Sequence, residues 1–287
     1  MEILQFFSRK SIFSRLRSFN FKKSDKSVRS EIWEMGNNSK IKQLIEKIDQ
    51  IPGWLAPEAA FFTAYLLLYQ KNINLTGNIT EIGVYCGKYL AVLYQHANEN
   101  EHVLGVDAFI GATNIEQPKQ NVFQNILKIC GDNRRLNIFV GDSLDLTSKD
   151  ILELIHGKNT RLISIDGGHT ADVVFHDLEL SISILKEGGI IVMDDIFNHS
   201  LPGVTEGFFR FMFEEKNRKI LAPFAHCYNK LFLTTPDHYS SYFRESLEIL
   251  EEMKDYSTYQ RTKTRMEENH GMSFVPELLG YEILSFL

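Results

Sequence analysis

Short apolar runs alternate with helix-like segments from about residue 78 of this 287-residue chain. The pattern predicts strands at 79–84, 102–106, 136–140, 161–165 and 189–193. Between and after them it predicts helices near 87–99, 118–130, 147–156, 170–186 and 203–216. Strands and helices that alternate in this way predict an α/β fold, a doubly wound, mostly parallel sheet with right-handed crossovers.

The segments before and after this alternating region do not continue its strand–helix pattern. Before it, the sequence predicts a helix at about 40–50, a turn at Ile51-Pro-Gly-Trp54 and a helix from Pro57 to about Lys71. Pro57 occupies a first-turn position, where proline is tolerated. An antiparallel pair around 226–228 and 231–235, joined by Asn229-Lys230, follows the alternating region, and then a charged helix near 238–254 and a strand-like tail at 281–287. We expect four parts: a basic arm at 1–35, N-terminal helices at 36–77, a core at 78–235 and a C-terminal extension at 236–287.

Charge is distributed unevenly along the chain. Residues 1–30 hold eight Lys or Arg against two acids, a net of +6, so the remainder carries −12 of the formal total of −6. An acidic body argues against a general nucleic-acid-binding surface. The arm fits a cationic amphipathic helix on an anionic membrane, an organelle transit peptide or a poorly ordered basic arm, and the sequence leaves these readings open.

The three cysteines indicate neither a disulfide framework nor a zinc site. Cys86, Cys130 and Cys227 are odd in number, far apart and without a CxxC pair, so a reducing cytosol fits best. The longest apolar stretches, such as 59–69, are too short to span a bilayer. We expect a cytoplasmic protein, with peripheral membrane contact through residues 1–30 left open.

Three acids stand at the ends of two predicted buried strands. Asp166 occurs in Ile165-Asp-Gly-Gly-His169, and Asp194 and Asp195 follow Met193. Open α/β sheets place their ligands at such strand ends, and clustered carboxylates cost free energy unless a cation or a substrate proton offsets their charge. Hard oxygen ligands without cysteine favour Mg²⁺, Mn²⁺ or Ca²⁺ over zinc. The alternative is that these acids cap the helices that follow.

Glycines and a further acid mark the ends of the first two strands. The segment Ile79-Thr-Glu81-Ile-Gly83-Val-Tyr-Cys-Gly87 has a G-x-x-x-G spacing, without the G-x-G-x-x-G that binds a dinucleotide pyrophosphate. Asp107 ends the next strand, where an acid can bond both ribose hydroxyls of a nucleoside. The third strand ends in Val140-Gly-Asp142-Ser143, a polar cluster that could meet an adenine or simply cap a helix.

Together these motifs resemble class I S-adenosylmethionine-dependent methyltransferases over about 78–235. The resemblance implies that the glycine turn at Gly83 and Gly87 passes the methionine part of the cofactor. It implies that Asp107 holds the ribose and that Asp142, with Ser143 beside it, approaches the adenine amino group. Glu81 would support the glycine loop or the cofactor's amino group.

The later motifs narrow the resemblance. Ser164-Ile-Asp166-Gly-Gly-His169-Thr, the pair Asp194-Asp195 and Pro202-Gly-Val-Thr-Glu-Gly207 are similar to the metal-dependent O-methyltransferases of macrolide and aminocoumarin sugars, the macrocin and mycinamicin type. That resemblance implies Mg²⁺ or Mn²⁺ at Asp166, Asp194 and Asp195, and His169 as the base. The alternative role for His169 is a helix N-terminal residue bonded to a strand-end carbonyl.

These observations predict an S-adenosylmethionine-dependent, divalent-metal-dependent O-methyltransferase of a sugar, glycoside or other polar small molecule, with no nucleic-acid partner. A nucleotide-using oxidoreductase or hydroxylase is one alternative, weakened by the missing dinucleotide fingerprint. A membrane-associated, non-catalytic scaffold of glycan assembly is another, favoured by the basic arm. A homo-oligomer is left open.

Overall fold

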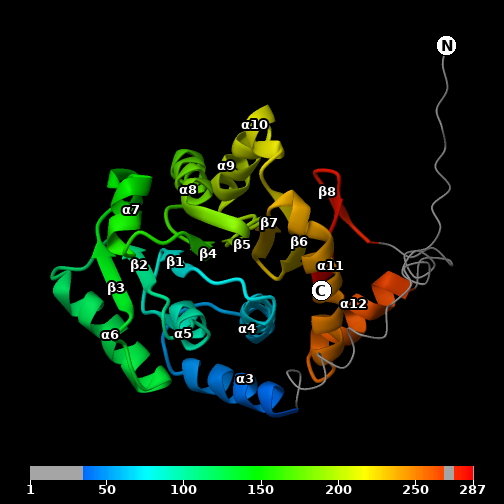
Figure 1. The fold of residues 1–287 in the computed structure, drawn as a ribbon, viewed down its shortest axis with the longest axis horizontal. Helices are drawn as coiled ribbons and strands as arrows, with labels where there is room; N and C mark the ends of the chain where they lie inside the picture. Colours follow the sequence, from blue (N-terminus) through cyan, green and yellow to red (C-terminus); the bar gives the residue numbers. More distant parts are fainter. Residues whose placement is uncertain (1–34, 268–274, 287) are drawn as a thin grey trace.

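The computed structural model describes residues 35–267 and 275–286 (Figure 1). A single large sheet crosses the middle of the molecule, and helices cover both of its faces. The expected basic arm at 1–35, with its membrane contact through residues 1–30, lies almost wholly outside the described residues. So does Leu287, the last residue of the expected tail.

The sheet has eight strands in the order β10-β6-β7-β5-β4-β1-β2-β3. β7 runs antiparallel to its neighbours β5 and β6, and the other pairs are parallel. The strands are β1 (Asn78–Ile82), β2 (Val103–Asp107), β3 (Leu136–Val140), β4 (Thr160–Ile165), β5 (Leu185–Met193), β6 (Ala222–Cys227), β7 (Lys230–Thr234) and β10 (Leu284–Phe286). A separate small hairpin pairs β8 (Glu277–Leu278) with β9 (Tyr281–Glu282). The prediction of a doubly wound, mostly parallel α/β sheet is confirmed.

Two hydrophobic cores lie on opposite faces of the sheet. Leu162 and Ile190 belong to one core, whereas the next residues, Ile163 and Ile191, belong to the other. The first core takes in α3 (Met35–Ile48), α4 (Pro57–Asn72), α5 (Lys88–Gln95), α6 (Glu116–Cys130), α11 (Tyr239–Glu252) and α12 (Ser257–Glu267). The second takes in α7 (Ser148–Leu154), α8 (Ala171–Ile184) and α9 (Pro202–Met212). The central strands β1 and β4 are therefore buried at every position, because both sides of each strand are covered.

Several predicted boundaries differ from the structure. β1 ends at Ile82 rather than 84, because Gly83 adopts a φ of +87° and leaves the extended conformation. The helix expected at 203–216 is divided into α9 and the short α10 (Glu215–Arg218). The sequence did not predict α12. The predicted strand-like tail at 281–287 forms two short strands, β9 and β10, and β10 pairs with the main sheet.

The turn between β6 and β7 was also misplaced by one residue. It consists of Tyr228 and Asn229, and Lys230 is the first residue of β7 rather than part of the turn. A lysine at a strand start normally reaches solvent, but this side chain points inward because it has a buried carboxylate partner, described below.

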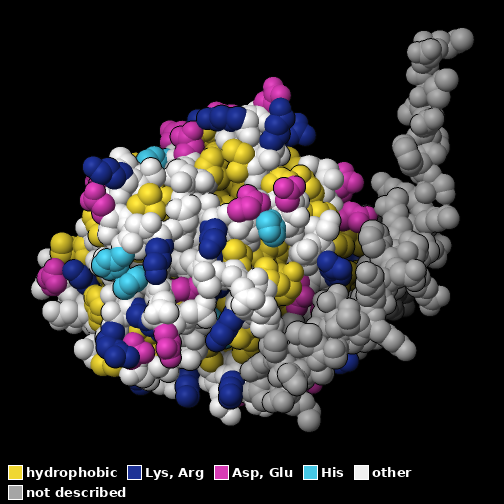
Figure 2. Space-filling view, viewed as in Figure 1, with side chains coloured by type: hydrophobic (Ala, Val, Ile, Leu, Met, Phe, Trp, Pro, Cys, Tyr) yellow, Lys and Arg dark blue, Asp and Glu magenta, His cyan; other side chains and the backbone are white. Residues whose placement is uncertain are grey.

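No helix within 35–267 or 275–286 has the length and apolarity needed to cross a membrane. The face drawn in Figure 2 mixes acidic and basic side chains, with hydrophobic side chains in small groups between them.

Candidate metal and cofactor site

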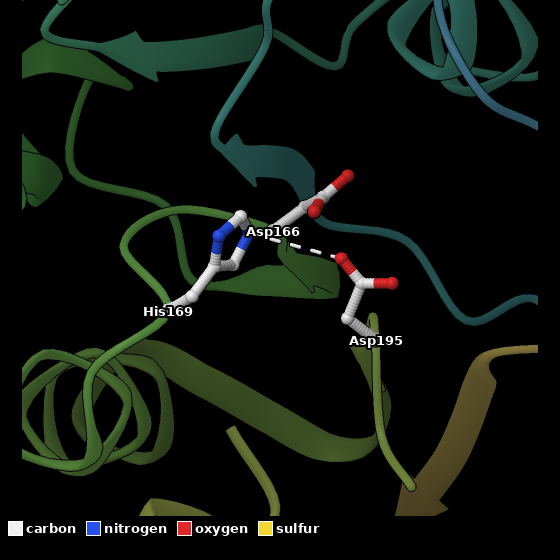
Figure 3. Close-up of side chains that lie close together, drawn as sticks. All are labelled: Asp166, His169 and Asp195. Carbon is white, nitrogen blue, oxygen red and sulfur yellow. Dashed lines mark ion pairs between the residues drawn. The ribbon is translucent and has the colours of Figure 1, made fainter. Parts of the chain in front are cut away.

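Three predicted site residues converge beyond the carboxyl ends of β4 and β5 (Figure 3). One ligand atom each from Asp166, His169 and Asp195 lies within 4.8 Å of the other two. His169 Nε2 is 3.7 Å from Asp195 Oδ2, and its side chain is 44% exposed. The group is therefore open to solvent on the histidine side. We call it the 166–169–195 cluster.

Local structure fixes Asp195 within this cluster. Its backbone has a φ of +52°, a conformation that non-glycine residues adopt at a cost of about 1–3 kcal/mol. Asn198 Nδ2 and Asn229 Nδ2 both donate to Asp195 Oδ1, at 3.0 and 3.2 Å. Because Oδ1 is held by two amides, Oδ2 is the oxygen left facing His169.

Asp194, the third predicted metal ligand, points elsewhere. Its Oδ2 forms an ion pair and a hydrogen bond with Lys230 Nζ, and its Oδ1 accepts from Asp195 N at 2.9 Å. Both partners are buried, with side chains 3% and 1% exposed. Asp194 is thus adjacent to the 166–169–195 cluster, but both of its oxygens already have partners in the protein.

Burial and nearby charges shift the pKa values of Asp166 and Asp194 in opposite directions. Burial, together with the charge of Asp194, raises the pKa of Asp166 well above its ordinary value. Burial also opposes ionisation of Asp194, but the attraction of Lys230 and hydrogen bonds from neighbours outweigh it and lower its pKa. For Lys230, burial opposes the charge, and the attraction of Asp194 and Asp166 raises the pKa above its ordinary value. A second positive charge near Asp166 would offset the repulsion that raises its pKa.

Glu81 lies deeper, on β1. Its side chain is 2% exposed, and its Oε2 atom has no hydrogen-bond partner among the described residues. Burial raises the pKa of Glu81 well above its ordinary value, against the attraction of Lys230. Lys230 in turn sits over the ring of Tyr89, 4.4 Å from its centroid. An unpartnered buried carboxyl beside the glycine turn is a group that a ligand's amino group could satisfy.

The glycine turn after β1 is shaped by packing as well as by any ligand. A side chain on Gly83 would place its Cβ 1.8 Å from the carbonyl oxygen of Asp166, so only glycine fits. Asp107 holds the same turn: its Oδ2 accepts from the backbone amides of Val84 and Tyr85, both at 2.7 Å, and its Oδ1 accepts from Phe109 N at 2.6 Å. Gly87 precedes α5 with a φ of +82°.

After β3, the side chain of Asp142 caps a short helix. Asp142 Oδ1 accepts from Leu144 N at 3.0 Å and caps the short 3₁₀ helix Ser143–Asp145. Ser143 is 6% exposed, and its carbonyl oxygen bonds the ring of His176. The capping role that the sequence left open is therefore present at Asp142, and His176 packs against this segment.

Sequence reasoning missed Lys230 and the two asparagines that hold Asp195. Lys230 was assigned to a turn, although the run Leu231-Phe-Leu that follows it signals a buried strand. Asn229 was predicted only as a turn residue, and Asn198 was not predicted as a site residue. Their role depends on how two distant loops meet, which a single sequence does not reveal.

Comparison with known proteins agrees with this architecture. Residues 80–196 match the family model described as a methyltransferase domain. Cofactor-bound Rv0187 from MTB has 15% identity and a TM-score of 0.50, covering 74% of this chain and 95% of that one. The O-methyltransferase NovP has 11% identity and a TM-score of 0.49, over 61% and 78%. MycE methyltransferase from the mycinamycin biosynthetic pathway, solved with Mg, SAH and mycinamycin VI, has 14% identity and a TM-score of 0.46, over 68% and 54%. No curated protein sequence matched.

Residues 80–196 are thus a methyltransferase domain, and the sheet that carries them has the Rossmann-like class I fold. The chain is a methyltransferase, as the sequence predicted, and the class that its motifs resemble uses S-adenosylmethionine as methyl donor. Neither the oxidoreductase nor the scaffold alternative gains support from these matches.

Proposed function

We propose that this methyltransferase transfers a methyl group from S-adenosylmethionine to a hydroxyl of a sugar, a glycoside or another polar small molecule, with Mg²⁺ or Mn²⁺ bound at the carboxyl ends of β4 and β5. The observation that carries the proposal is the 166–169–195 cluster, in which two acids and an imidazole converge beside the glycine turn. Such a set of hard oxygen ligands suits these cations.

Asp166 and Asp195 are the proposed direct ligands. Neither has a lysine or arginine partner among the described residues, and Asn198 and Asn229 already orient the Asp195 carboxylate. Asp194, the third acid that the sequence resemblance assigned to the metal, already bonds Lys230 and Asp195 N and has only its remaining lone pairs for a cation. A bound cation would supply positive charge that favours loss of a proton from an acceptor hydroxyl.

His169 is the proposed base. Its imidazole is partly exposed at the edge of the cluster, and Nε2 of a neutral imidazole can accept a proton from an acceptor hydroxyl. The short distance to Asp195 Oδ2 also suits a role as a third metal ligand. A His169→Gln variant separates the two roles, because a base can be lost without loss of metal affinity and a ligand cannot.

The cofactor is proposed to lie along the turn between β1 and α5. Asp107 keeps this turn in place and has about one spare lone pair for a ribose hydroxyl, since a carboxylate can accept about four hydrogen bonds and three are made here. Gly83 and Gly87 would flank the methionine part, Glu81 would receive its amino group, and Asp142 and Ser143 would lie near the adenine.

Calorimetry with S-adenosylhomocysteine tests the cofactor assignment, and transfer of labelled methyl groups to a panel of sugars and glycosides tests the acceptor. We expect binding of S-adenosylhomocysteine that Asp107→Ala weakens strongly, and transfer that EDTA abolishes and added Mn²⁺ restores. Tight binding of NADH with no response to either adenosyl compound would contradict the proposal.

A cytoplasmic location, with peripheral contact of residues 1–30 to anionic membranes, is a further proposal. It rests on the charge of +6 in that segment. Removal of residues 1–30 should release the protein from anionic vesicles and leave turnover of a soluble acceptor nearly unchanged. Equal vesicle binding with and without the segment would rule out the membrane contact.

A further inference from the structure

A cavity of about 680 Å³, lined mostly by residues of polar and charged types, lies at the opposite end of the sheet, where the parallel strands begin. Its walls come from the end of α4, the segment before β1, the loop before β2 and the starts of β4 and β5. Three lysines and four asparagines dominate the lining: Lys71, Lys158, Lys186, Asn74, Asn98, Asn100 and Asn159, with Thr76, Gly77 and Glu101 completing it. β4 alone separates this cavity from Asp166 by six residues, or roughly 20 Å.

The lysines of this cavity have no acidic partners within the described parts of the chain. Lys186 Nζ donates to the carbonyl oxygen of Thr76 at 2.6 Å, and Lys158 Nζ donates to that of Asn100 at 3.3 Å. No contact of either ammonium group with a carboxylate is found there, and the same holds for Lys71. Each lysine therefore keeps its charge available to an anion.

The single acid in the lining does not cancel these charges. Glu101 is 3% exposed and forms an ion pair with Arg161, which is fully buried. Both Glu101 oxygens bond Arg161, and they also accept from the backbone amides of Gly77 and Asn98. The attraction and hydrogen bonds of Arg161 outweigh burial and lower the pKa of Glu101. With that pair neutral as a unit, the cavity keeps a net charge of about +3 from its lysines.

Gln70 extends the buried hydrogen-bond network that Glu101 and Arg161 form. It accepts from Arg161 through Oε1 at 2.6 Å and donates to the carbonyl oxygen of Arg161 through Nε2 at 2.9 Å. Glu101 in this network accepts from the backbone amides of Gly77 and Asn98, so part of the lining is held in place before an anion binds. Cations gathered in this way are unexpected on a body whose sequence after residue 30 carries −12.

We propose that this cavity binds a small phosphorylated molecule through a diphosphate group or two neighbouring phosphates. Lys71, Lys158 and Lys186 supply charge-assisted hydrogen bonds to the phosphate oxygens. The asparagine side chains and the Thr76 hydroxyl supply donors and acceptors for the uncharged part of the ligand. The volume lies in the range of small-molecule sites. The ligand cannot contact the 166–169–195 cluster from here, so this proposal does not depend on the methyl-transfer reaction.

The test is calorimetry of the full chain with inorganic pyrophosphate and with ADP, in metal-free buffer at low salt. The variant Lys158→Gln/Lys186→Gln removes two of the cations, and Lys71→Gln removes the one that makes no hydrogen bond to the fold. Lys40→Gln/Lys47→Gln on α3 is the matched control, with the same loss of charge on an exposed helix face.

We expect both probes to bind the wild-type protein and the control with similar affinity. We expect Lys71→Gln to weaken binding at least about tenfold, and the double variant considerably more, since each removes a charge-assisted bond. Tighter binding of ADP than of pyrophosphate would identify a nucleotide-like ligand, whereas equal binding would restrict recognition to the phosphates.

Three results would overturn the proposal. One is the absence of binding by the wild-type protein, and another is an equal loss in the control variant, which would reflect net charge alone. The third is binding only to vesicles that contain phosphoinositides, which would make the lysines a membrane contact. Unfolding temperatures of all variants, measured without ligand, show whether a loss of binding reflects a loss of fold.

Discussion

The two ends of the central sheet both carry buried acids, but these acids have different partners. At the starts of the strands, Glu101 is paired with the buried Arg161 and has every oxygen bonded. At the carboxyl ends, Asp194 has the equivalent partner in Lys230, while Asp166 and Asp195 have no lysine or arginine partner among the described residues. Burial of an acid therefore does not identify a ligand site. What distinguishes Asp166 and Asp195 is that two half-buried carboxylates converge with an imidazole and neither forms an ion pair with a lysine or arginine of the described chain, so their charge is costly until something positive binds.

The largest expected effect of a single substitution is on catalysis at the carboxyl end. If His169 is the base, His169→Gln should lower kcat by about 10²–10⁴-fold and leave Mn²⁺ and S-adenosylhomocysteine affinities near wild type. Part of the loss should return as pH rises, since solvent hydroxide can substitute for the base. Rates and calorimetry on one preparation check this. Loss of Mn²⁺ affinity together with rate would make His169 a ligand instead.

The next largest effect concerns stability, and it compares the two buried ion pairs directly. Lys230→Met leaves Asp194 buried without its cation, and Arg161→Met does the same to Glu101, so each should lower the free energy of unfolding by about 3–5 kcal/mol. Urea unfolding measures both. Adding Asp194→Asn to Lys230→Met should recover part of the loss, because no unpaired charge then stays buried. A loss below about 1 kcal/mol at Lys230 would show that the pair is not formed.

A smaller effect is expected from the residues that orient Asp195. Asn229→Ala removes one of the two amides on Asp195 Oδ1, so Mn²⁺ affinity should fall about 10–100-fold, the usual effect of losing a group that orients a ligand. Asn100→Ala, at the other end of the sheet, is the control and should bind Mn²⁺ as the wild-type protein does. Equal Mn²⁺ affinities in the two variants would show that Asn229 does not orient Asp195 for metal binding.

The smallest effect concerns pH. Burial lowers the pKa of His226, near the carboxyl end, and of His96, near the opposite end, to about 4 each. The unfolded chain, with a reference value of about 6.5, binds more protons between these values. Stability should therefore be complete above about pH 6.5 and fall as pH decreases toward 4, by about 1–2 kcal/mol for each histidine at pH 5.

Urea unfolding at pH 7 and pH 5 measures this slope. His226→Gln should make it shallower, because the variant no longer has an imidazole that must stay neutral in the folded state. An unchanged slope would assign the acid sensitivity to other groups.

The sequence predicted the fold well because short apolar runs mark the strands that are covered on both faces, and that signal is local. It predicted that Asp166, His169 and Asp195 would be neighbours for the same reason, since all three follow buried strands. It could not reveal that Lys230 pairs with Asp194, because that contact joins residues 36 apart in sequence through the tertiary fold. Nor could it assign the C-terminal extension, where β10 is only three residues long and gains its order by pairing with β6.

The central claim is that the carboxyl-end acids without a cation partner hold a divalent metal. Binding of Mn²⁺, followed by calorimetry and electron paramagnetic resonance, tests it most directly in wild type, Asp195→Asn and Asp142→Asn. Asp142 is the matched control, an acid that follows the edge strand β3 and whose carboxylate caps a 3₁₀ helix. The account predicts one bound Mn²⁺ in wild type and Asp142→Asn, and its loss in Asp195→Asn. Unchanged Mn²⁺ binding by Asp195→Asn, or none by the wild-type protein, would contradict it.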